Sequence, residues 1–323
     1  MDEGLKILLG ATVADAAARP LHWIYDPKKL KKYIKGNKEI AFFKENKCPF
    51  YSVPRGYNSG YADMAQVMFR TIITSKKKSE ILTNFKRNIV KHFGPGSVYW
   101  KNLKERRKYK KIKWRKPLKG SWLHQNTLET IQNIKAKKRV TGGTKVLETD
   151  AFNAALPYYF LVSKDDKEVK KVIRTVANSN VNEVYGLARL KIIDLASKGE
   201  KNPIQKFIKL NKKNRYFKEV IIDIKKVLKL KNQNHINVTR KLGKACSDPG
   251  NFKSSIHCII TSNNYKPAII KTIKSGGCNC SRSVYIGSFF SALKGIKSIP
   301  PQWIKNTKTS KEIISHKKNL INI

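Results

Sequence analysis

Apolar residues recur every three or four positions in four stretches of the chain, which is the spacing of one face of an α-helix. These stretches, at residues 80–93, 167–178, 183–197 and 215–230, predict four helices. The third is apolar around more of its circumference, so its buried face is less sharply defined. The alternation typical of a strand is scarce, and residues 139–147 (RVTGGTKVL) are the best, weak candidate for one.

Glycine and proline separate these predicted helices, as in Gly94-Pro95-Gly96 and Gly276-Gly277. The sequence contains no long low-complexity linker and no internal repeat. We therefore expect an all-α protein with a single compact domain over residues 1–310. A basic insertion loop is expected at about residues 101–120, and a C-terminal tail at residues 311–323.

Three further segments differ from ordinary amphipathic helices. Residues 4–26 (GLKILLGATVADAAARPLHWIYD) are rich in glycine and alanine, which lets other backbones approach closely, and their Asp15 needs partners if it is buried. Residues 60–72 (GYADMAQVMFRTI) begin an apolar helix with Asp63, for which simple capping is the alternative to a functional role. In residues 275–293 (SGGCNCSRSVYIGSFFSAL), two glycines lead into an apolar helix, and the N–H groups at such a helix start suit an anion or a metal.

The charge balance is the unusual feature of the composition. The 323 residues include 68 Lys and Arg against 22 Asp and Glu, which gives a formal net charge of +46. Such a surplus attracts polyanions without sequence preference, because neutralised phosphates release counterions. The alternative is compositional drift, because Lys shares AT-rich codons with the abundant Asn and Ile. The lysines are spread along nearly the whole chain, which favours drift over a dedicated nucleic-acid-binding face.

One segment is denser in cations than the rest. Residues 101–119 read KNLKERRKYKKIKWRKPLK, with Tyr109 and Trp114 among the basic residues. Cations interleaved with aromatic rings are typical of surfaces that follow a phosphate backbone and stack bases. The alternative is a solvated insertion loop that ends at Pro117 and Gly120.

The cysteines and the apolar runs bear on the compartment. Five cysteines are too few, and odd in number, for a disulfide scaffold. No stretch approaches the roughly 18 uninterrupted apolar residues of a membrane helix. The first apolar stretch is broken by Asp15, which argues against a secretory signal. We expect a cytoplasmic protein, with the nucleus as a second compartment, that is neither secreted nor bound to a membrane.

Taken in order, the three distinctive segments resemble the ADP-ribosylglycohydrolase family, from Gly4 to about Trp303. The phrases ADAAARPLHWIYD, ACSDPGNF and GGCNCSRSVYIGSFF are most similar to its branch of J-type crystallins and selenoprotein J. The resemblance implies an orthogonal all-α fold with a two-magnesium site. It implies hydrolysis of the glycosidic bond of ADP-ribose attached to proteins or small molecules, and so ADP-ribose or an ADP-ribosylated protein as the partner.

The resemblance also implies where the site lies. The family's T-D-D-T ligand motif reads Tyr61-Ala62-Asp63-Met64 here, and its G-G-D-T-D-T motif reads Gly276-Gly277-Cys278-Asn279-Cys280-Ser281. Asp63 is therefore the candidate catalytic residue. The candidate metal ligands are Asp63, Cys278, Cys280 and Ser281. The candidate substrate-binding residues are Asp15, His22, Thr149, Asp150, Gly276, Gly277 and Asn279.

The departures from the family motifs bear on activity. His22 falls near a catalytic acidic residue of many members, and Ala154 replaces an arginine of the diphosphate segment at 149–157. Magnesium prefers about six oxygen ligands, and the single carboxylate of Asp63 does not balance two divalent cations. We therefore predict that the two-magnesium site does not form.

The cysteine pair leaves three alternatives. Cys278 and Cys280 are neutral thiols that fill the space of lost aspartates, or they bind a soft metal such as zinc with His22. In the third alternative, a thiol at the start of a helix is reactive. His124 and His257 are expected to be packing or surface residues, and Asp248-Pro249-Gly250 is expected to be a turn.

Three functions follow from the sequence. The preferred one is an ADP-ribosylglycohydrolase-like protein with a degenerate metal site, weak or no activity and a crystallin-like or binding role. The first alternative is an active ADP-ribosyl hydrolase that uses Asp63 with a remodelled Cys/Asp metal site. The second is a protein that binds nucleic acid or poly(ADP-ribose) through its basic surface.

Overall fold

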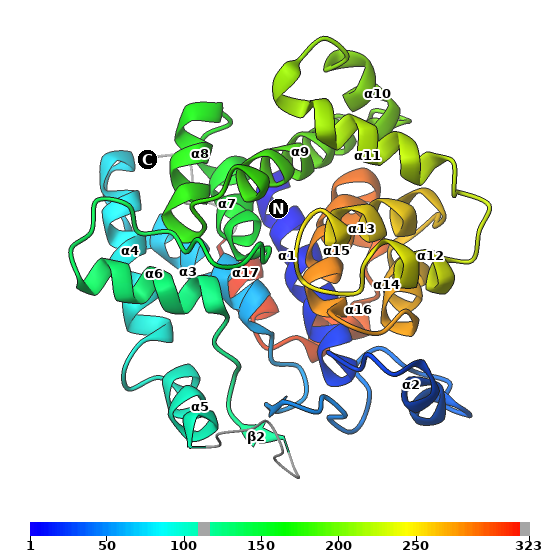
Figure 1. The fold of residues 1–323 in the computed structure, drawn as a ribbon, viewed down its shortest axis with the longest axis horizontal. Coiled ribbons are helices and arrows are strands. Elements are labelled where there is room, and N and C mark those ends of the chain that lie inside the picture. Colours follow the sequence, from blue (N-terminus) through cyan, green and yellow to red (C-terminus); the bar gives the residue numbers. More distant parts are fainter. Residues whose placement is uncertain (109–116, 317–323) are drawn as a thin grey trace.

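A computed structural model describes residues 1–108 and 117–316, which form seventeen α-helices and two very short strands (Figure 1). The α-helices are α1 (Glu3–Ala18), α2 (Pro27–Ile34), α3 (Gly60–Thr74), α4 (Ile81–Phe93), α5 (Val98–Arg107), α6 (Gln125–Lys135), α7 (Asp150–Leu161), α8 (Asp166–Val176), α9 (Asn180–Ser197), α10 (Pro203–Leu210), α11 (Lys218–Leu228), α12 (His235–Leu242), α13 (Gly250–Ile260), α14 (Tyr265–Lys274), α15 (Asn279–Lys294), α16 (Pro301–Asn306) and α17 (Ser310–Ser315). The strands β1 (Tyr51–Ser52) and β2 (Leu118–Lys119) pair in parallel. Short 3₁₀ turns are η1 (Arg19–Leu21), η2 (Lys78–Glu80), η3 (Arg215–Phe217) and η4 (Ile296–Ser298). The prediction of an all-α fold is confirmed.

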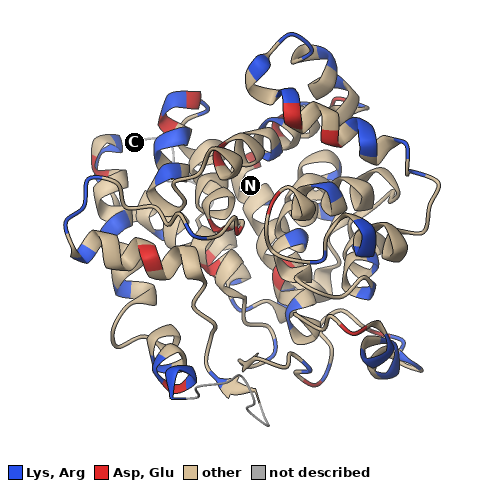
Figure 2. Cartoon of the chain, viewed as in Figure 1, with Lys and Arg blue, Asp and Glu red and all other residues tan. Residues whose placement is uncertain are grey.

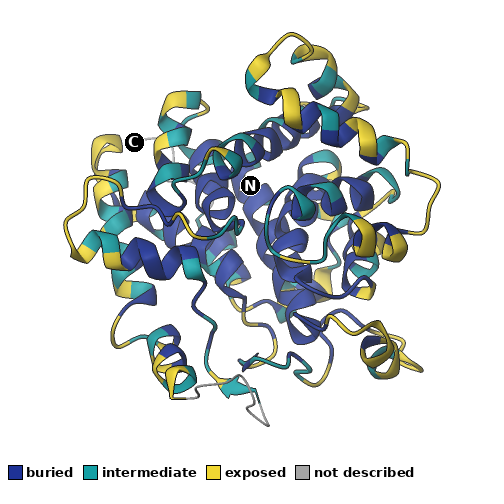
Figure 3. Cartoon of the chain, in the orientation of Figure 1, coloured by how far each residue is buried: buried dark blue, intermediate teal, exposed yellow. Residues whose placement is uncertain are grey.

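Helices α1 and α15 lie side by side at the centre of the molecule (Figure 1) and run antiparallel. Near the start of α1, Ser291 Oγ donates to the Lys6 carbonyl at 2.6 Å. Near its end, Cys280 Sγ lies 3.8 Å from the carbonyl oxygen of Asp15. Almost every residue of both helices is buried, so neither helix has a face that is exposed to solvent (Figure 3).

Small residues explain how closely these two helices approach. A Cβ added at Gly10 would lie 2.3 Å from Ser291 Cβ, and one added at Gly287 would lie 2.5 Å from Ala14 Cβ. Neither separation is sterically possible without a shift of the backbone. The glycine-rich and alanine-rich character of residues 4–26 therefore serves the packing of the central pair.

The remaining helices surround this pair. In Figure 1, α3, α4, α6, α7 and α8 lie on one side of it, and α12, α13 and α14 on the other. Exposed residues concentrate on these outer helices, while the central pair is dark blue over most of its length (Figure 3). The apolar core is one continuous cluster that extends from α1 to α17.

The four periodic stretches form helices as predicted. Residues 80–93 correspond to α4 and the end of η2, and residues 167–178 to α8. Residues 183–197 lie in α9, and residues 215–230 form η3 followed by α11. In α4 the buried residues are apolar and four positions apart, and in α8 they are the valines and the isoleucine at three-residue and four-residue spacing together with Thr175.

The weak strand candidate at residues 139–147 is wrong. Its glycines lie against the end of α8 instead of a strand: Gly143 N donates to the Val176 carbonyl at 3.0 Å, and Asn178 N to the Gly143 carbonyl at 2.8 Å. A Cβ added at Gly142 would lie 2.3 Å from the Arg174 carbonyl oxygen. The two glycines are thus required for close approach to a helix end, where Gly143 forms a single isolated bridge with Ala177.

The expected loop and the expected C-terminal tail both contain more regular structure than predicted. Within the expected loop at residues 101–120, the first seven residues complete α5 and residues 118–119 form β2, while residues 109–116 lie outside the described residues. The expected tail from residue 311 begins inside α17, where Ile313 is fully buried and Glu312 pairs with Arg70. Residues 311–316 therefore pack with the domain.

Among the described residues, no helix is both long and apolar enough to span a membrane. Lys and Arg lie mainly on the outer helices (Figure 2). Three arginines are exceptions, since Arg19, Arg189 and Arg282 are buried to within 1% of complete burial. Each of them is held by carbonyl, carboxylate or amide oxygens, as a buried cation requires.

Candidate functional site

The glycine pair at the start of α15 makes a tight turn against the end of α1. Gly276 and Gly277 have φ values of +67° and +64°, a region that favours glycine. A Cβ added at Gly277 would lie 2.5 Å from the Lys244 carbonyl oxygen. Gly277 exchanges backbone hydrogen bonds with the chain after η1, because Trp23 N donates to its carbonyl and its own N–H donates to Ile24, each at 2.8 Å.

The N–H groups expected to receive an anion are therefore used by the protein itself. Gly277 N–H is bonded to Ile24, and Cys278 N–H donates to the Lys244 carbonyl at 2.7 Å. The buried Arg282 occupies the same turn, since its guanidinium donates to the Gly276 and Lys244 carbonyls. Gly276 and Gly277 thus brace two loops against α15 in this structure.

The thiol of Cys278 lies at the centre of a polar group that is closed to solvent. His22 Nε2 is 3.3 Å, Tyr61 Oη 3.4 Å and Ser281 Oγ 3.1 Å from Cys278 Sγ. Cys246 lies on the loop after α12, and its Sγ is 4.0 Å from Glu148 Oε1. Cys278, His22 and Tyr61 have no exposed surface.

These contacts distinguish the two thiols electrostatically. Burial by itself would raise the pKa of Cys278, but hydrogen bonds from Cys246, His22 and Ser281 and the charge of His22 outweigh it and hold the pKa well below its ordinary value. The hydrogen bond to Cys278 and burial raise the pKa of Cys246 well above its ordinary value.

Aromatic rings cover this group. Trp23 stacks on His22 at 4.3 Å between ring centroids and meets Trp122 edge to face at 5.4 Å. Trp122 in turn carries the guanidinium of Arg106 at 3.9 Å from its ring centroid. Trp23 has φ +59°, an unusual backbone conformation for a bulky residue, and it is held there by its hydrogen bond to Gly277.

Cys280 faces away from Cys278. Its thiol lies against the backbone carbonyl of Asp15, within the contact between α1 and α15. The Asp15 carboxylate accepts hydrogen bonds from Ser59 N at 2.7 Å and Asn58 Nδ2 at 3.0 Å, and from the Ser59 hydroxyl. Burial raises the pKa of Asp15 to about 6. Asp15 therefore anchors the N-cap of α3 to α1, and its recorded partners belong to the protein.

Thr149 and Asp150 lie at the start of α7, next to His124. His124 Nδ1 is 2.6 Å from Asp150 Oδ1, and both side chains are almost completely buried. Burial acts to lower the pKa of His124, but the charge and hydrogen bond of Asp150 outweigh it and raise the pKa to about 9. Burial and the charge of Asp150 raise the pKa of Glu148 to about 7.

Tyr61 joins the two groups. Its ring lies 4.1 Å from that of His124, and its hydroxyl lies next to Cys278. Glu148 forms a second link, because Cys246 Sγ is 4.0 Å from Glu148 Oε1. The predicted residues His22, Cys278, Ser281, Thr149 and Asp150 thus belong to one connected interior region.

Some predicted substrate-binding residues keep unsatisfied polar atoms. Thr149 Oγ1, Asp150 Oδ2 and Asn279 Oδ1 are buried without a hydrogen-bond partner among the described residues. The amide nitrogen of Asn279 donates to the Leu21 carbonyl at 3.0 Å. Water or a polar ligand group is the usual partner of such atoms.

Asp63 lies apart from the thiols in its contacts. Its carboxylate accepts a hydrogen bond from the Tyr99 hydroxyl and lies 3.9 Å from His92 Nε2. The side chain is 19% exposed. A cavity of about 470 Å³ between α3 and α4 borders this end of the site and is lined by His92 and Arg70, among others. The structure records no contact that brings Asp63 to Cys278, Cys280 or Ser281.

A network of hydrogen bonds continues from Ser281, the neighbour of Cys278, into the interior. Asn251 Nδ2 donates to Ser281 Oγ at 2.7 Å, and Asn251 Oδ1 accepts from Arg189 at 3.2 Å. Arg189 forms a bidentate pair with Asp248 at 2.8 and 2.6 Å. The segment expected to be a simple turn therefore carries a buried ion pair that continues to the start of α15.

The residues present do not fit a pair of magnesium ions. Among residues 1–108 and 117–316, no group of three or more His, Cys, Asp and Glu side chains is arranged to hold a metal ion. Magnesium prefers oxygen ligands, whereas the two cysteines offer sulfur and point in different directions. Asp63, the remaining carboxylate of the two motifs, is bonded to Tyr99.

Sequence reasoning missed several members of this region. His124 was expected to be a packing or surface residue, and Tyr61, Tyr51, Glu148 and Cys246 were not considered as site residues. Glu148 directly precedes the candidate pair Thr149-Asp150, so its position was a usable signal. The position of Cys246 carried no local signal, because its contact is with Glu148, 98 positions earlier in the chain.

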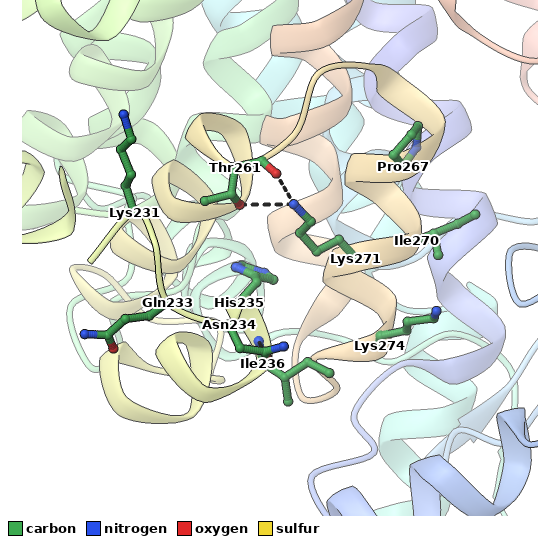
Figure 4. A pocket seen from close by; sticks show the side chains of 10 residues that line it. All are labelled: Lys231, Gln233, Asn234, His235, Ile236, Thr261, Pro267, Ile270, Lys271 and Lys274. Atoms are coloured by element: carbon green, nitrogen blue, oxygen red, sulfur yellow. Dashed lines mark hydrogen bonds between the residues drawn. The ribbon is translucent and has the colours of Figure 1, made fainter. Parts of the chain in front are cut away.

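A separate cavity of about 480 Å³ lies between α12 and α14 (Figure 4). Lys231, Lys271 and Lys274 line it, together with His235. Lys271 Nζ is held by the carbonyl of Thr261 and lies 3.2 Å from Thr261 Oγ1, as the dashed lines in Figure 4 show. None of the predicted site residues lines this cavity.

Comparison with known proteins gives consistent matches over the whole chain. The family model described as ADP-ribosylglycohydrolase matches residues 2–322. Crystallin J1A of Tripedalia cystophora is 26% identical over 324 residues, covering 99% of this chain and 96% of the crystallin. Crystallin J1B of the same organism is 24% identical over 325 residues, with the same coverage. A solved structure described as an ADP-ribosylglycohydrolase-related protein complex matches with a TM-score of 0.59 and 11% identity, covering 97% of this chain and 95% of that one.

Proposed function

Since the chain belongs to the ADP-ribosylglycohydrolase family, we propose that it keeps the family's fold without the family's magnesium-dependent hydrolysis and has a crystallin-like structural role. The observation that carries this proposal is the surrounding of Cys278. At a motif position where the resemblance expects a metal-binding aspartate, a thiol contacts His22, Tyr61 and Ser281 and has no exposed surface.

The surrounding packing supports the same proposal. The N–H groups of Gly277 and Cys278 donate to protein carbonyls, so they are not free to bind a phosphate. Tyr61, at the first position of the other motif, fills the space between Cys278 and His124 with an aromatic ring. The similarity to two crystallins along nearly their full length agrees with a role based on a stable fold.

The experiment is a metal and ligand assay on the full chain. Metal content is measured by mass spectrometry, and ADP-ribose binding is measured by calorimetry with and without Mg²⁺. Release of ADP-ribose from peptides modified on Ser or Arg is followed alongside, with a magnesium-dependent member of the family as a positive control. We expect no stoichiometric magnesium, no magnesium-dependent binding and no release.

Stoichiometric magnesium with magnesium-dependent release of ADP-ribose would overturn the proposal in favour of an active hydrolase. In that case Asp63→Ala abolishes turnover and leaves the melting temperature nearly unchanged. Stoichiometric zinc with release lost in Cys278→Ser would favour the remodelled Cys/Asp site instead.

A second candidate function is polyanion binding, which is favoured by the exposed cations of α5. Lys101, Lys104 and Arg107 are exposed on this peripheral helix (Figure 2). Arg106 is not a suitable test residue for this surface, because it packs on Trp122 and donates to the Leu123 carbonyl at 3.1 Å.

A matched pair of triple variants tests this candidate. One variant changes Lys101, Lys104 and Arg107 to Gln, and the control changes the exposed Lys212, Lys213 and Arg215 to Gln. Both remove three charges. Binding of single-stranded DNA and poly(ADP-ribose) is measured over a range of salt concentrations. If α5 carries a dedicated binding surface, the first variant alone binds more weakly and with less dependence on salt. If both variants lose the same affinity, binding depends only on the general positive charge of the protein.

A further inference from the structure

We propose that two adjoining cavities beside α12 bind one amphiphilic anion, which consists of a medium-length alkyl chain and a carboxylate or phosphate head group. The first is the cavity of about 480 Å³ between α12 and α14. The second, of about 430 Å³, lies between α2 and the neighbouring parts of α12 and α14. Both volumes fall within the range of about 300 to 1,000 Å³ that is typical of small-molecule sites. The inference is independent of the proposed structural role.

The two cavities share part of their lining. Ile236 on α12 and Lys274 on α14 line both of them. In Figure 4 these two residues lie at the lower edge of the first cavity. A ligand that occupies one cavity therefore reaches the other past these two side chains.

The second cavity offers an apolar surface to the alkyl chain. Its apolar lining residues are Ile24, Pro27, Leu30, Ile34 and Ile236. Ile236 is 37% exposed, so its side chain is open to a ligand. An alkyl chain in this cavity leaves water, and each methylene that it buries strengthens binding about fourfold.

Backbone contacts hold the wall of the second cavity in place. The Ile24 carbonyl accepts a hydrogen bond from Gly277 N at 2.8 Å. A Cβ added at Gly276 would lie 3.2 Å from Leu30 Cδ2, so α2 packs directly against the turn before α15. The cavity is therefore formed before a ligand binds, which lowers the entropic cost of binding.

The charged residues that line the two cavities are all lysines. They are Lys31, Lys231, Lys244, Lys271 and Lys274. Among the described residues, no Asp or Glu lines either cavity. Two of these lysines are held by neutral oxygens, since Lys244 Nζ donates to the Tyr25 carbonyl at 3.2 Å and Lys271 Nζ donates to the Thr261 carbonyl. Their charges are thus oriented but not neutralised, and an anionic head group supplies the missing counter-charge.

The neighbouring charges leave this region positive. Burial and the charges of Arg240 and Arg282 lower the pKa of Lys244 below its ordinary value, and Asp26 is the acidic residue that opposes them. The Asp26 carboxylate is already used, because it caps the first turn of α2. Binding of an anion therefore relieves repulsion among cations that the protein itself does not balance.

Lys274 is the cation best placed for the head group, because it lines both cavities and lies one helical turn after Lys271 in α14. Lys231 lies at the opposite edge of the first cavity in Figure 4. His235 adds no charge, since burial holds its pKa well below the ordinary value and its Nδ1 lies 2.9 Å from His257 Nδ1. The head group is therefore expected at Lys274, with the alkyl chain against Ile236 and α2.

The test is calorimetric titration of the full chain with decanoate and with decyl phosphate, which differ only in the head group. Decanol, which lacks the charge, and octanoate, which lacks two methylenes, are titrated for comparison. We expect saturable binding of a single decanoate or decyl phosphate per chain, and the tighter of the two identifies the head group. Octanoate and decanol should each bind roughly tenfold more weakly or less.

A matched pair of double variants locates the site. The first combines Ile236→Asn with Lys274→Gln, and the control combines Leu210→Asn with Lys209→Gln on α10, where Leu210 is 63% exposed. Both remove one lysine and one exposed apolar side chain. We expect the first to bind at least tenfold more weakly than the wild type and the control to bind equally well. Circular dichroism and the melting temperature confirm that each variant is folded.

NMR of the wild type gives a readout that needs no variant. The methyl signals of Ile34 and Ile236 are expected to shift on addition of the tighter ligand, while those of isoleucines far from α2 and α12 stay unchanged. Equal weakening in the two double variants, or decanol binding as tightly as decanoate and decyl phosphate, would overturn the proposal. Binding to anionic vesicles without binding of either single-chain anion would also overturn it, in favour of a membrane surface.

Discussion

The two segments that resemble the family's metal-binding motifs have different surroundings in this protein. At the start of α3, Asp63 keeps its carboxylate, is 19% exposed and borders a cavity of about 470 Å³ through its neighbour His92. At the start of α15, Cys278 and its neighbours His22 and Tyr61 have no exposed surface. One end is partly open and acidic, and the other is closed and built on sulfur.

The difference shows how a charged position is lost without loss of the fold. A buried carboxylate without a counter-ion is costly, whereas a thiol packs like a small apolar group. At the closed end, Tyr61 and Trp23 pack around His22, and the carboxylate expected from the motif is absent. At the open end, Tyr99 and solvent satisfy Asp63, so the charge is retained.

The largest expected effect concerns the ion pair behind the closed end. Arg189→Leu leaves Asp248 buried without its partner, and we expect a loss of about 3 to 5 kcal/mol in the free energy of unfolding. The same change at the open end, Arg70→Leu, removes a pair whose side chains are 43% and 28% exposed and should change stability by about 1 kcal/mol or less.

Urea denaturation of the two variants measures this contrast. Both lose a bidentate arginine, so the comparison isolates burial. If both variants lose the same free energy of unfolding, the buried ion pair of Arg189 and Asp248 is no more important for stability than the exposed pair of Arg70 and Glu312.

A pH-dependent effect is expected at His124, which Tyr61 connects to the closed end. The pKa of His124 is raised to about 9 in the folded protein, above its unfolded value of 6.5, so the pair with Asp150 stabilises the protein fully below pH 6.5. This stabilisation is lost as the pH rises through 9. Over that range the difference in unfolding free energy between the wild type and His124→Gln should shrink by up to about 3 kcal/mol.

Denaturation of both proteins at pH 6 and pH 9.5 checks this expectation, and titration of the His124 ring protons by NMR gives the pKa directly. A gap between wild type and variant that stays constant across the two pH values would contradict a charged His124–Asp150 pair.

The smallest effect is expected at Asp63 itself. Asp63→Asn keeps an oxygen to accept the Tyr99 hydrogen bond and removes the charge from a partly exposed position. We expect a change of about 1 kcal/mol or less in unfolding free energy. Tyr99→Phe, which removes the other partner, is the control. If Asp63→Asn lost as much unfolding free energy as Arg189→Leu, the two ends of the site would depend equally on their charged residues.

Much of the architecture could be predicted from the sequence. The apolar spacing located α4, α8, α9 and α11, because a helix that packs on one side repeats every three or four residues. The central helices α1 and α15 are buried nearly all round, so periodicity does not define their faces, and their glycines and other small residues identified them instead. The strand proposed at residues 139–147 failed because two glycines that suggest a hairpin turn serve here to approach the end of α8.

The candidate site was predicted less completely. The sequence named His22 and Cys278 together, and the structure places their side chains in contact. The pairing of His124 with Asp150, and of Cys246 with Glu148, depends on residues that are far apart in the chain and that local spacing does not relate. Whether ADP-ribose or a metal binds remains a prediction, since it depends on chemistry that the fold alone does not specify.

The sequence by itself located α4, α8, α9 and α11 and the segments of α1, α3 and α15, and it fixed which residues occupy the motif positions and how large the positive charge is. These follow from local spacing and composition. Only the tertiary structure decided that Cys278 and Cys280 face different partners, because the Cys278 thiol meets His22 from the turn after α1 whereas the Cys280 thiol lies against the Asp15 carbonyl within α1. It also decided that Tyr61 and His22 surround Cys278, because the close packing of α1 against α15 brings distant parts of the chain to one point.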